Sequence, residues 1–227
     1  MEESTIMDLI INPHVVPTYV SFALLSSVVL IVVALIIRAS MSLVPRGVQN
    51  FMEIVGEAML NLSVDNIGHK WGEFFFPLIG TLFLYILVGN CFGLIPGFFA
   101  PTANINTTAS MAVPVFLIYQ FWGFKVHGLH YIKHFLGPIR SLAALPLMML
   151  MFVVEVISHL ARPLTLSVRL FGNMIAKHLL LLVLGLLVPL VIPTAILALG
   201  VLVSVVQALV FTLLSALYIA GAVEEAH

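Results

Sequence analysis

The sequence predicts an all-α polytopic membrane protein, with about five membrane-crossing helices and one amphipathic surface helix. Two observations predict this class. Hydrophobic residues make up 62% of the 227 residues and charged residues 8%, whereas an ordinary soluble domain has about 25% charged residues. The apolar residues also gather in runs of about 20 or more, the length that a helix needs to cross the hydrocarbon core. These runs leave no room for a separate soluble catalytic domain.

The apolar runs divide a single membrane domain, 1–227, into successive elements. We expect an outer N-terminal segment at 1–18, crossings at 19–37, 74–96 and 108–124, a long inclined helix at 141–188 and a last inclined helix at 191–222. A surface helix is expected at 47–68, where Glu53, Glu57, Asn61 and Asp65 recur every four residues and Phe51, Val55, Met59 and Leu62 lie on the other side. The polar loop 101–108 supplies caps for the third crossing.

The region 141–188 could be counted as two upright crossings that meet at Pro163. A single helix of this length would extend about 72 Å, more than twice the ~30 Å hydrocarbon core, so the region must either break or tilt. The residues around Pro163 lack the Gly, Asn and Asp of a tight turn. One kinked, steeply inclined helix is therefore favoured, and it would form a hairpin with the last helix.

The distribution of Lys and Arg predicts the orientation, because short cytoplasmic loops collect these residues. Basic residues follow the first crossing and separate the third from the fourth: Arg38, Arg46 and Lys70, then Lys125, Lys133 and Arg140. The N-terminus is then outside and the C-terminus cytoplasmic. The acidic N-terminal segment resembles neither a secretory signal nor a transit peptide, which favours a multi-pass protein of the bacterial inner membrane.

Several kinds of chemistry are not expected. A single cysteine, Cys91, provides neither a disulfide framework nor a cysteine-based metal site. His127, His130 and His134 are spaced like metal ligands, but no acidic ligand is near and we expect them to be solvated. We therefore predict no metal and no cofactor. The net charge of −1 argues against nucleic acid as a partner, and no Gly-rich phosphate loop is present for ATP chemistry.

Arg169 is the most informative residue, because it lies in an apolar stretch with no acidic residue closer than Glu155. A charge at mid-membrane costs from roughly 3 to more than 10 kcal/mol, so such a residue is functional by default. On a helical projection Glu155, Ser158, Arg162, Thr165 and Asn173 fall within about 40° of it. A packing seam would account for the Ser, Thr and Asn side chains, but not for two arginines facing one carboxylate. The counter-charge of Arg169 is therefore expected on another polypeptide.

Other polar residues follow near the predicted outer end of the hairpin. His178 points about 180° away from Arg169 on the helical projection. We interpret it either as a packed core residue or as a proton carrier. We expect Lys177 to snorkel to the outer interface. In the last helix Ser204 and Gln207 share a face with Gly200, where close packing or a wet crevice would need small and polar residues.

Four segments resemble subunit a of the F-type ATP synthase membrane sector, in its bacterial and chloroplast form. They are ARPLTLSVRLFGNM, VVQALVFTLLSALYIAGAVEE, FFFPLIGTLFLYILVGNCFGLIP and PTANINTT, and the resemblance covers nearly the whole chain. It implies a non-catalytic stator subunit that embraces a rotating ring of subunit c and joins peripheral-stalk subunit b. Arg169 would face the ring carboxylate and separate two aqueous half-channels for protons.

The same resemblance implies roles for the other polar residues. Asn173, His178 and Gln207 would belong to the outer half-channel and Glu155 to the cytoplasmic one. Secondary candidates are Arg162, Thr165, Ser158 and Ser204. The choice between proton and sodium would rest mostly with the ring. Many bacterial relatives carry glutamate where this chain has His178, and Gly200 offers no ionisable group to pair with it.

A different class of function is also compatible with an intramembrane arginine. A stand-alone secondary transporter could hold an anionic substrate at Arg169. Such transporters usually contain internal repeats with matched broken helices, and the first 140 residues contain no second copy of the charged hairpin. A purely structural scaffold would leave Arg169 unexplained.

Overall fold

The computed structural model describes residues 16–39, 41–42, 47–95, 97–128, 145–187 and 191–223. Throughout these residues the regular structure is helical, which confirms the predicted all-α class. The helices are α1 (Thr18–Ala39), α2 (Val48–Ile67), α3 (His69–Phe92), the short 3₁₀ helix η2 (Pro101–Ala103), α4 (Ile105–His127), α6 (Leu145–Leu187) and α7 (Val191–Val223). Arg46, His130, Lys133, His134, Arg140 and most of the N-terminal segment lie outside the described residues.

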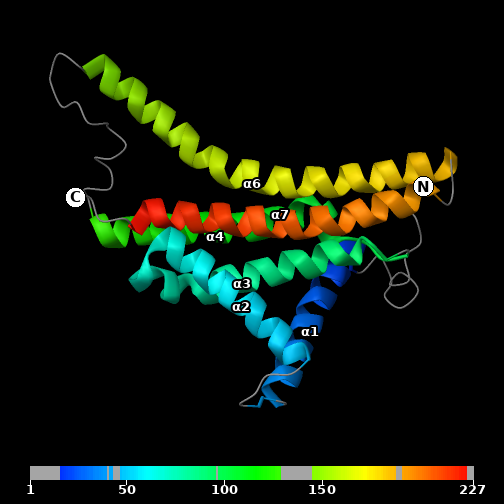
Figure 1. The fold of residues 1–227 in the computed structure, drawn as a ribbon. Coiled ribbons are helices and arrows are strands. Elements are labelled where there is room, and N and C mark those ends of the chain that lie inside the picture. Colours follow the sequence, from blue (N-terminus) through cyan, green and yellow to red (C-terminus); the bar gives the residue numbers. More distant parts are fainter. Residues whose placement is uncertain are drawn as a thin grey trace.

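Five of the described helices are long and apolar enough to cross a membrane: α1, α3, α4, α6 and α7. The prediction of about five crossings is therefore confirmed. Figure 1 shows α3, α4 and α7 running side by side with the second half of α6, whereas α1 diverges from them and α2 crosses α3 obliquely. Because α7 contacts α2, α3, α4 and α6, it forms the centre of the bundle.

The region around Pro163 is a single helix rather than two crossings. Helix α6 has 43 residues and includes Pro163, so it is about 65 Å long. Proline removes one backbone hydrogen bond and crowds the preceding turn, which bends a helix. In Figure 1 the first part of α6 bends away from α7 and the second part runs along it. The two helices therefore form the predicted long hairpin, and the polar residues of α6 lie along one continuous axis.

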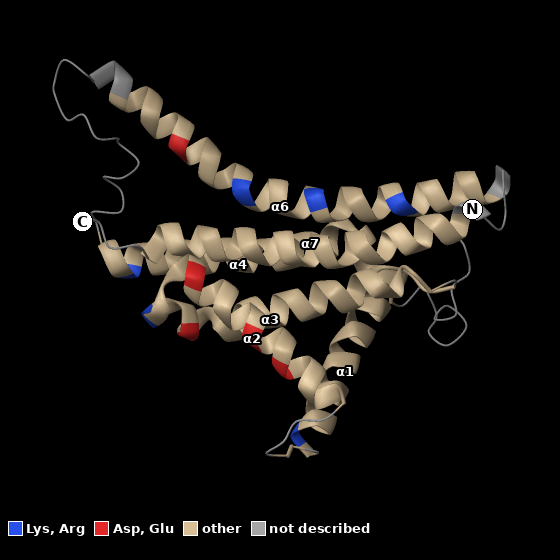
Figure 2. Cartoon of the chain, viewed as in Figure 1, with Lys and Arg blue, Asp and Glu red and all other residues tan. Residues whose placement is uncertain are grey.

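Helix α2 is amphipathic and packs along α3 and α7. Its acidic residues are exposed, and Figure 2 shows them as red segments of α2. Met59 and Ser63 are buried on the opposite side, although Phe51, which we expected on that side, is 60% exposed. Helix α3 approaches closely at Gly72, where an added Cβ would lie 2.7 Å from the Cα of Val64. The Ser63 hydroxyl donates to the carbonyl oxygen of Gly72 at 2.7 Å, which fixes this crossing.

The loop 101–108 caps α4 as expected. Asn104 is the N-cap, and its side-chain oxygen accepts a hydrogen bond from the Asn106 backbone N–H at 2.9 Å. Capping satisfies one of the backbone donors that the first turn of a helix leaves unpaired. The loop itself is packed inside the protein, because Pro101, Thr102 and Ala103 are buried. It therefore closes one end of the space between α3, α4 and α6.

Apolar side chains fill the interior between the helices in two main clusters. One cluster joins α2, α3, α4, α6 and α7 and contains Met59, Phe83, Ile86, Met111, Ala112, Leu166, Leu170, Ala208 and Phe211. The second lies nearer the C-terminal end of α7 and includes Phe75, Ile79, Tyr119 and Ile219. Many large apolar residues of α6 and α7 are exposed, including Leu164, Val168, Leu179 and Leu202. The hairpin therefore presents an apolar face to lipid or to a partner.

Candidate functional site

The polar residues predicted to share a face of α6 are accessible from outside the chain. Ser158, Thr165, Arg169 and Asn173 are exposed, and Glu155 and Arg162 are partly exposed. The neighbouring side of α6, turned by about 60–100° from Arg169 on a helical projection, is buried and contributes Leu166 and Leu170 to the core. Asn173 and Arg162 also contact neighbouring helices, but Ser158, Thr165 and Arg169 are exposed, so packing between helices does not account for the whole stripe. The stripe leaves Arg169 on the outer surface of an apolar helix, where a second molecule can reach it.

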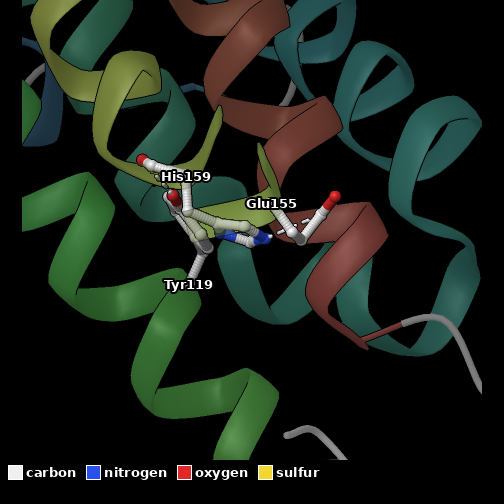
Figure 3. A network of polar contacts seen from close by, with 3 residues as sticks. All are labelled: Tyr119, Glu155 and His159. Carbon is white, nitrogen blue, oxygen red and sulfur yellow. Dashed lines mark hydrogen bonds and ion pairs between the residues drawn. The ribbon is translucent and has the colours of Figure 1, made fainter. Parts of the chain in front are cut away.

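A first polar group, which we call the Glu155 cluster, lies toward the N-terminal half of α6 and consists of Glu155, His159, Arg162, Tyr119 and Tyr218. The Nε2 atom of His159 lies 3.3 Å from Oε1 of Glu155. The Tyr119 hydroxyl, from α4, donates to the backbone carbonyl oxygen of His159 at 3.4 Å. Figure 3 shows these three side chains together.

Arg162 completes the Glu155 cluster by contacts with aromatic rings. Its Cζ atom lies 5.1 Å from the ring centroid of Tyr218 and 5.9 Å from that of Tyr119. A guanidinium group over a tyrosine ring is stabilised electrostatically by the negative ring face. The two tyrosines thus hold the charge of Arg162 between α4, α6 and α7.

A second polar group, the Asn173 cluster, joins α6 to α7 and α3 and consists of Asn173, Gln207, Ser204, Asn90 and Thr102. The Nδ2 atom of Asn173 donates to Oε1 of Gln207 at 2.9 Å. The Asn90 amide donates to the Ser204 carbonyl oxygen at 3.3 Å, and the Thr102 hydroxyl donates to Oδ1 of Asn90 at 2.6 Å. Polar groups therefore lie in two bonded sets, one at the exposed Asn173 and one at the capping loop, and Gln207 and Ser204 are three residues apart on α7.

Lys177 and His178 lie beside the Asn173 cluster. The prediction that Lys177 reaches the outer interface is wrong, because its side chain is only 6% exposed. Within the described residues its Nζ atom has no hydrogen-bond partner. Gly200 provides the space, since a Cβ there would lie 3.2 Å from Cδ of Lys177 and 2.8 Å from Leu94. The imidazole of His178 stacks on the Phe99 ring at a centroid distance of 5.8 Å.

The two polar clusters are separated by apolar packing. From Arg162 to Asn173 the axis of α6 advances about 16 Å, and the buried side chains in this interval include Leu166 and Leu170, which pack with Ala208 and Phe211. Arg169 is the ionisable residue of α6 in this interval, and it lies on the exposed face. The buried hydroxyls of Ser167, Thr212 and Ser215 each donate to a backbone carbonyl oxygen of their own helix. The described core between the two polar clusters is therefore mainly apolar, and Arg169 lies beside it on the exposed face.

Sequence reasoning missed several members of these clusters. The signal for His159 was its spacing of four residues from Glu155, which places the two side chains on neighbouring turns of a helix. Asn90, Thr102, Tyr119 and Tyr218 come from other helices and loops, and no local pattern joins them to α6. In the part of the chain that the structure describes, no group of three or more His, Cys, Asp or Glu side chains could hold a metal ion.

Comparison with known proteins gives consistent matches over most of the chain. The family model for the ATP synthase A chain matches residues 20–220. The chain is 50% identical to ATP synthase subunit a of Trichlorobacter lovleyi over 200 residues, which covers 88% of this chain and 84% of the relative. It is also 50% identical over 208 residues to ATP synthase subunit a of Geobacter sulfurreducens, with coverage of 92% and 88%. ATP synthase subunit a 1 of Pelobacter propionicus is 46% identical over 208 residues.

Proposed function

The chain belongs to the family of ATP synthase subunit a, and from this membership we propose that it is the proton-conducting stator subunit of a rotary F-type ATP synthase. In this proposal two aqueous half-channels load and unload the carboxylates of a rotating ring of subunit c. The chain itself carries no ATP chemistry. It is an integral membrane component of an ATP synthase complex, and its contribution is the route of the proton.

The observation that carries the proposal is the position of Arg169. Its side chain is exposed on a largely apolar helix, between two polar clusters that are separated mainly by apolar side chains. A lone positive charge in a membrane is stabilised by a negative partner, and a ring carboxylate supplies such a charge. Arg169 favours the ionised form of that carboxylate as it passes, which prevents a proton from crossing directly between the half-channels.

The residues on each side of Arg169 have separate tasks in this proposal. Glu155 belongs to the cytoplasmic half-channel, and Arg162, Ser158 and Thr165 lie along the same accessible stripe. Asn173, Gln207 and His178 belong to the outer half-channel, with Ser204 beside them. A proton enters outside, rides the ring for most of a turn and leaves inside. Each charge that crosses releases about 2.3 kcal/mol per 100 mV of membrane potential.

The proposed orientation places the N-terminus outside and the C-terminus in the cytoplasm of a bacterial cell. An odd number of crossings puts the termini on opposite sides, and basic residues end α1 and α4 at the side that the positive-inside rule assigns to the cytoplasm. The ring of subunit c is the proposed partner of the α6–α7 face. Peripheral-stalk subunit b and the lipid bilayer contact other exposed helix faces.

The test compares two arginines of the same helix by ATP-driven proton pumping in membrane vesicles. We expect Arg169→Ala to assemble but to abolish coupled pumping, because the half-channels are no longer separated by a charge. Arg162→Ala, seven residues earlier, retains much of the pumping, since aromatic rings rather than a ring carboxylate face Arg162. Subunit content is measured for both. Normal pumping by an assembled Arg169→Ala complex overturns the proposal and favours the transporter or scaffold interpretation.

A further inference from the structure

Glu155 does not act alone in the structure, because a buried imidazole lies against it. His159 is 8% exposed, whereas the Glu155 side chain is 38% exposed. Their side chains meet at 3.3 Å between Nε2 and Oε1, one helical turn apart (Figure 3). The Glu155 carboxylate is thus partly exposed on one side and contacts the imidazole of His159 on the other.

The surroundings of His159 fix its position. The Tyr119 hydroxyl donates to its backbone carbonyl oxygen, and the two rings lie 6.0 Å apart. Behind Tyr119 lies the ring of Tyr218, the single titratable residue of α7. The charged neighbours of the imidazole on its own helix are Glu155 and Arg162. A rigid aromatic wall therefore holds the imidazole toward the carboxylate.

A carboxylate and an imidazole within hydrogen-bond distance can share a proton, and when two such groups interact strongly the proton belongs to the pair rather than to either residue. A solvated carboxylate alone is ionised throughout the range between pH 5 and 8 and exchanges few protons there. Imidazole changes charge within that range. A group exchanges protons most efficiently when its pKa lies near the working pH. The pair can hold one proton in addition to the Nδ1–H of neutral imidazole. That proton lies either on Nε2, as imidazolium beside carboxylate, or on Oε1, as carboxylic acid beside neutral imidazole.

We propose that His159 is a proton-sharing partner of Glu155 that sets the pH range in which the cytoplasmic half-channel exchanges protons. His159 is a positioning residue: it acts through Glu155, whose exposed oxygen meets the water of the half-channel. The inference rests on the proposed stator function and adds to it a residue and a property, the pH dependence of conduction.

The experiment measures passive proton conduction through the membrane sector as a function of pH, in vesicles stripped of the catalytic head. His159→Gln retains a hydrogen-bond donor for Glu155 but cannot titrate. We expect it to lower conduction about tenfold, less than an obligate acid–base group contributes because Glu155 remains in the path. We also expect it to remove the inflection that an imidazole gives between about pH 5 and 8. Glu155→Gln has a similar effect, and the double variant is no slower than the slower single variant. His127→Gln, the same substitution on α4, is the matched control and keeps the parent profile.

A second variant, Glu155→Asp, tests the inference independently if His159→Gln fails to fold. Glu155→Asp keeps a half-exposed carboxylate but withdraws it from Nε2, so it stabilises imidazolium less and shifts the inflection to lower pH. The inference is overturned if assembled His159→Gln keeps the parent inflection, if the losses multiply in the double variant, or if Glu155→Asp leaves the profile unchanged. Arg169→Ala is tested in parallel. If this variant still shows coupled pumping, the stator function itself is contradicted. If Arg169→Ala abolishes pumping but His159→Gln keeps the parent pH profile, only the role of the Glu155–His159 pair is contradicted.

Discussion

The side-chain amide of Asn173 on α6 donates a hydrogen bond to the side-chain oxygen of Gln207 on α7, at 2.9 Å. Asn173 is exposed and Gln207 is buried. This bond is the polar connection between the accessible face that carries Arg169 and the interior of the Asn173 cluster. Because the two groups satisfy each other, removal of either leaves the other without its partner.

The Asn173–Gln207 bond predicts a non-additive pair of substitutions. Interhelical hydrogen bonds in membrane proteins contribute about 0.6 kcal/mol on average, which corresponds to about a threefold effect. We expect Asn173→Leu and Gln207→Leu each to slow ATP-driven pumping about threefold, and the double variant to be no slower than the slower single one. Thr212→Val is the control, because the Thr212 hydroxyl bonds within α7. Multiplied losses in the double variant mean that the two side chains act separately.

The buried ammonium group of Lys177 predicts a stabilising substitution. A buried donor without a partner costs about 1–3 kcal/mol, and more when it is charged. Lys177→Met keeps the length of the side chain and removes the charge, so we expect the purified complex to release subunit a at a higher temperature. Lys125→Met, at an exposed position of α4 where the Nζ atom lies 4.1 Å from the Trp122 ring centroid, does not raise that temperature. A lower release temperature for Lys177→Met means that water or another part of the assembly binds the ammonium group.

The close packing at Gly200 predicts that even one methyl group is costly. An added Cβ lies 2.8 Å from Cδ2 of Leu94 and 3.2 Å from Cδ of Lys177, and such overpacking costs about 1–3 kcal/mol. We expect Gly200→Ala to reduce the amount of subunit a in the membrane, with partial rescue by Lys177→Ala. Gly221→Ala, on the same helix with nothing within 4 Å of the new Cβ, is the matched control. Equal levels for both glycine variants contradict the packing argument.

The crossing of α2 and α3 predicts opposite effects at two helical glycines. At Gly72 a Cβ meets the backbone of Val64, which cannot move away as a flexible side chain could, so Gly72→Ala separates the helices and lowers thermal stability. At Gly56 nothing lies within 4 Å, and alanine stabilises a helix by about 0.5–1 kcal/mol relative to glycine. The midpoint temperatures of thermal denaturation of the two purified variants should therefore shift in opposite directions. Shifts of the same sign would contradict the close approach of α2 and α3 at Gly72.

The helices could be predicted from the sequence because hydropathy and length reflect a strong constraint. A backbone in lipid must satisfy its own hydrogen bonds, so an apolar run of sufficient length forms a helix. The continuity of α6 through Pro163 was also predictable, since the neighbouring residues lack turn chemistry. The periodicity of α6 further indicated which side chains share the face of Arg169, and these residues are accessible in the structure.

Contacts between helices were less predictable, because they depend on how each helix rotates and packs. Lys177 lies ten residues before the end of α6 at Leu187, about 15 Å along the axis, too far inside for an easy route to the interface. Its side chain instead occupies the space that Gly200 leaves on α7. His159 was overlooked because it lies off the polar stripe, and only the position of Tyr119 on α4 shows how it is held against Glu155.

The apolar packing of Leu166 and Leu170 against α7 has a consequence for the order of assembly. Between the two polar clusters the described core is filled mainly by apolar side chains. If the chain serves the stator function proposed above, a copy that enters the membrane before its ring is therefore expected not to leak protons. Synthesis of the subunit ahead of its partner would then cost the cell no ion gradient, because the rotor completes the proton route.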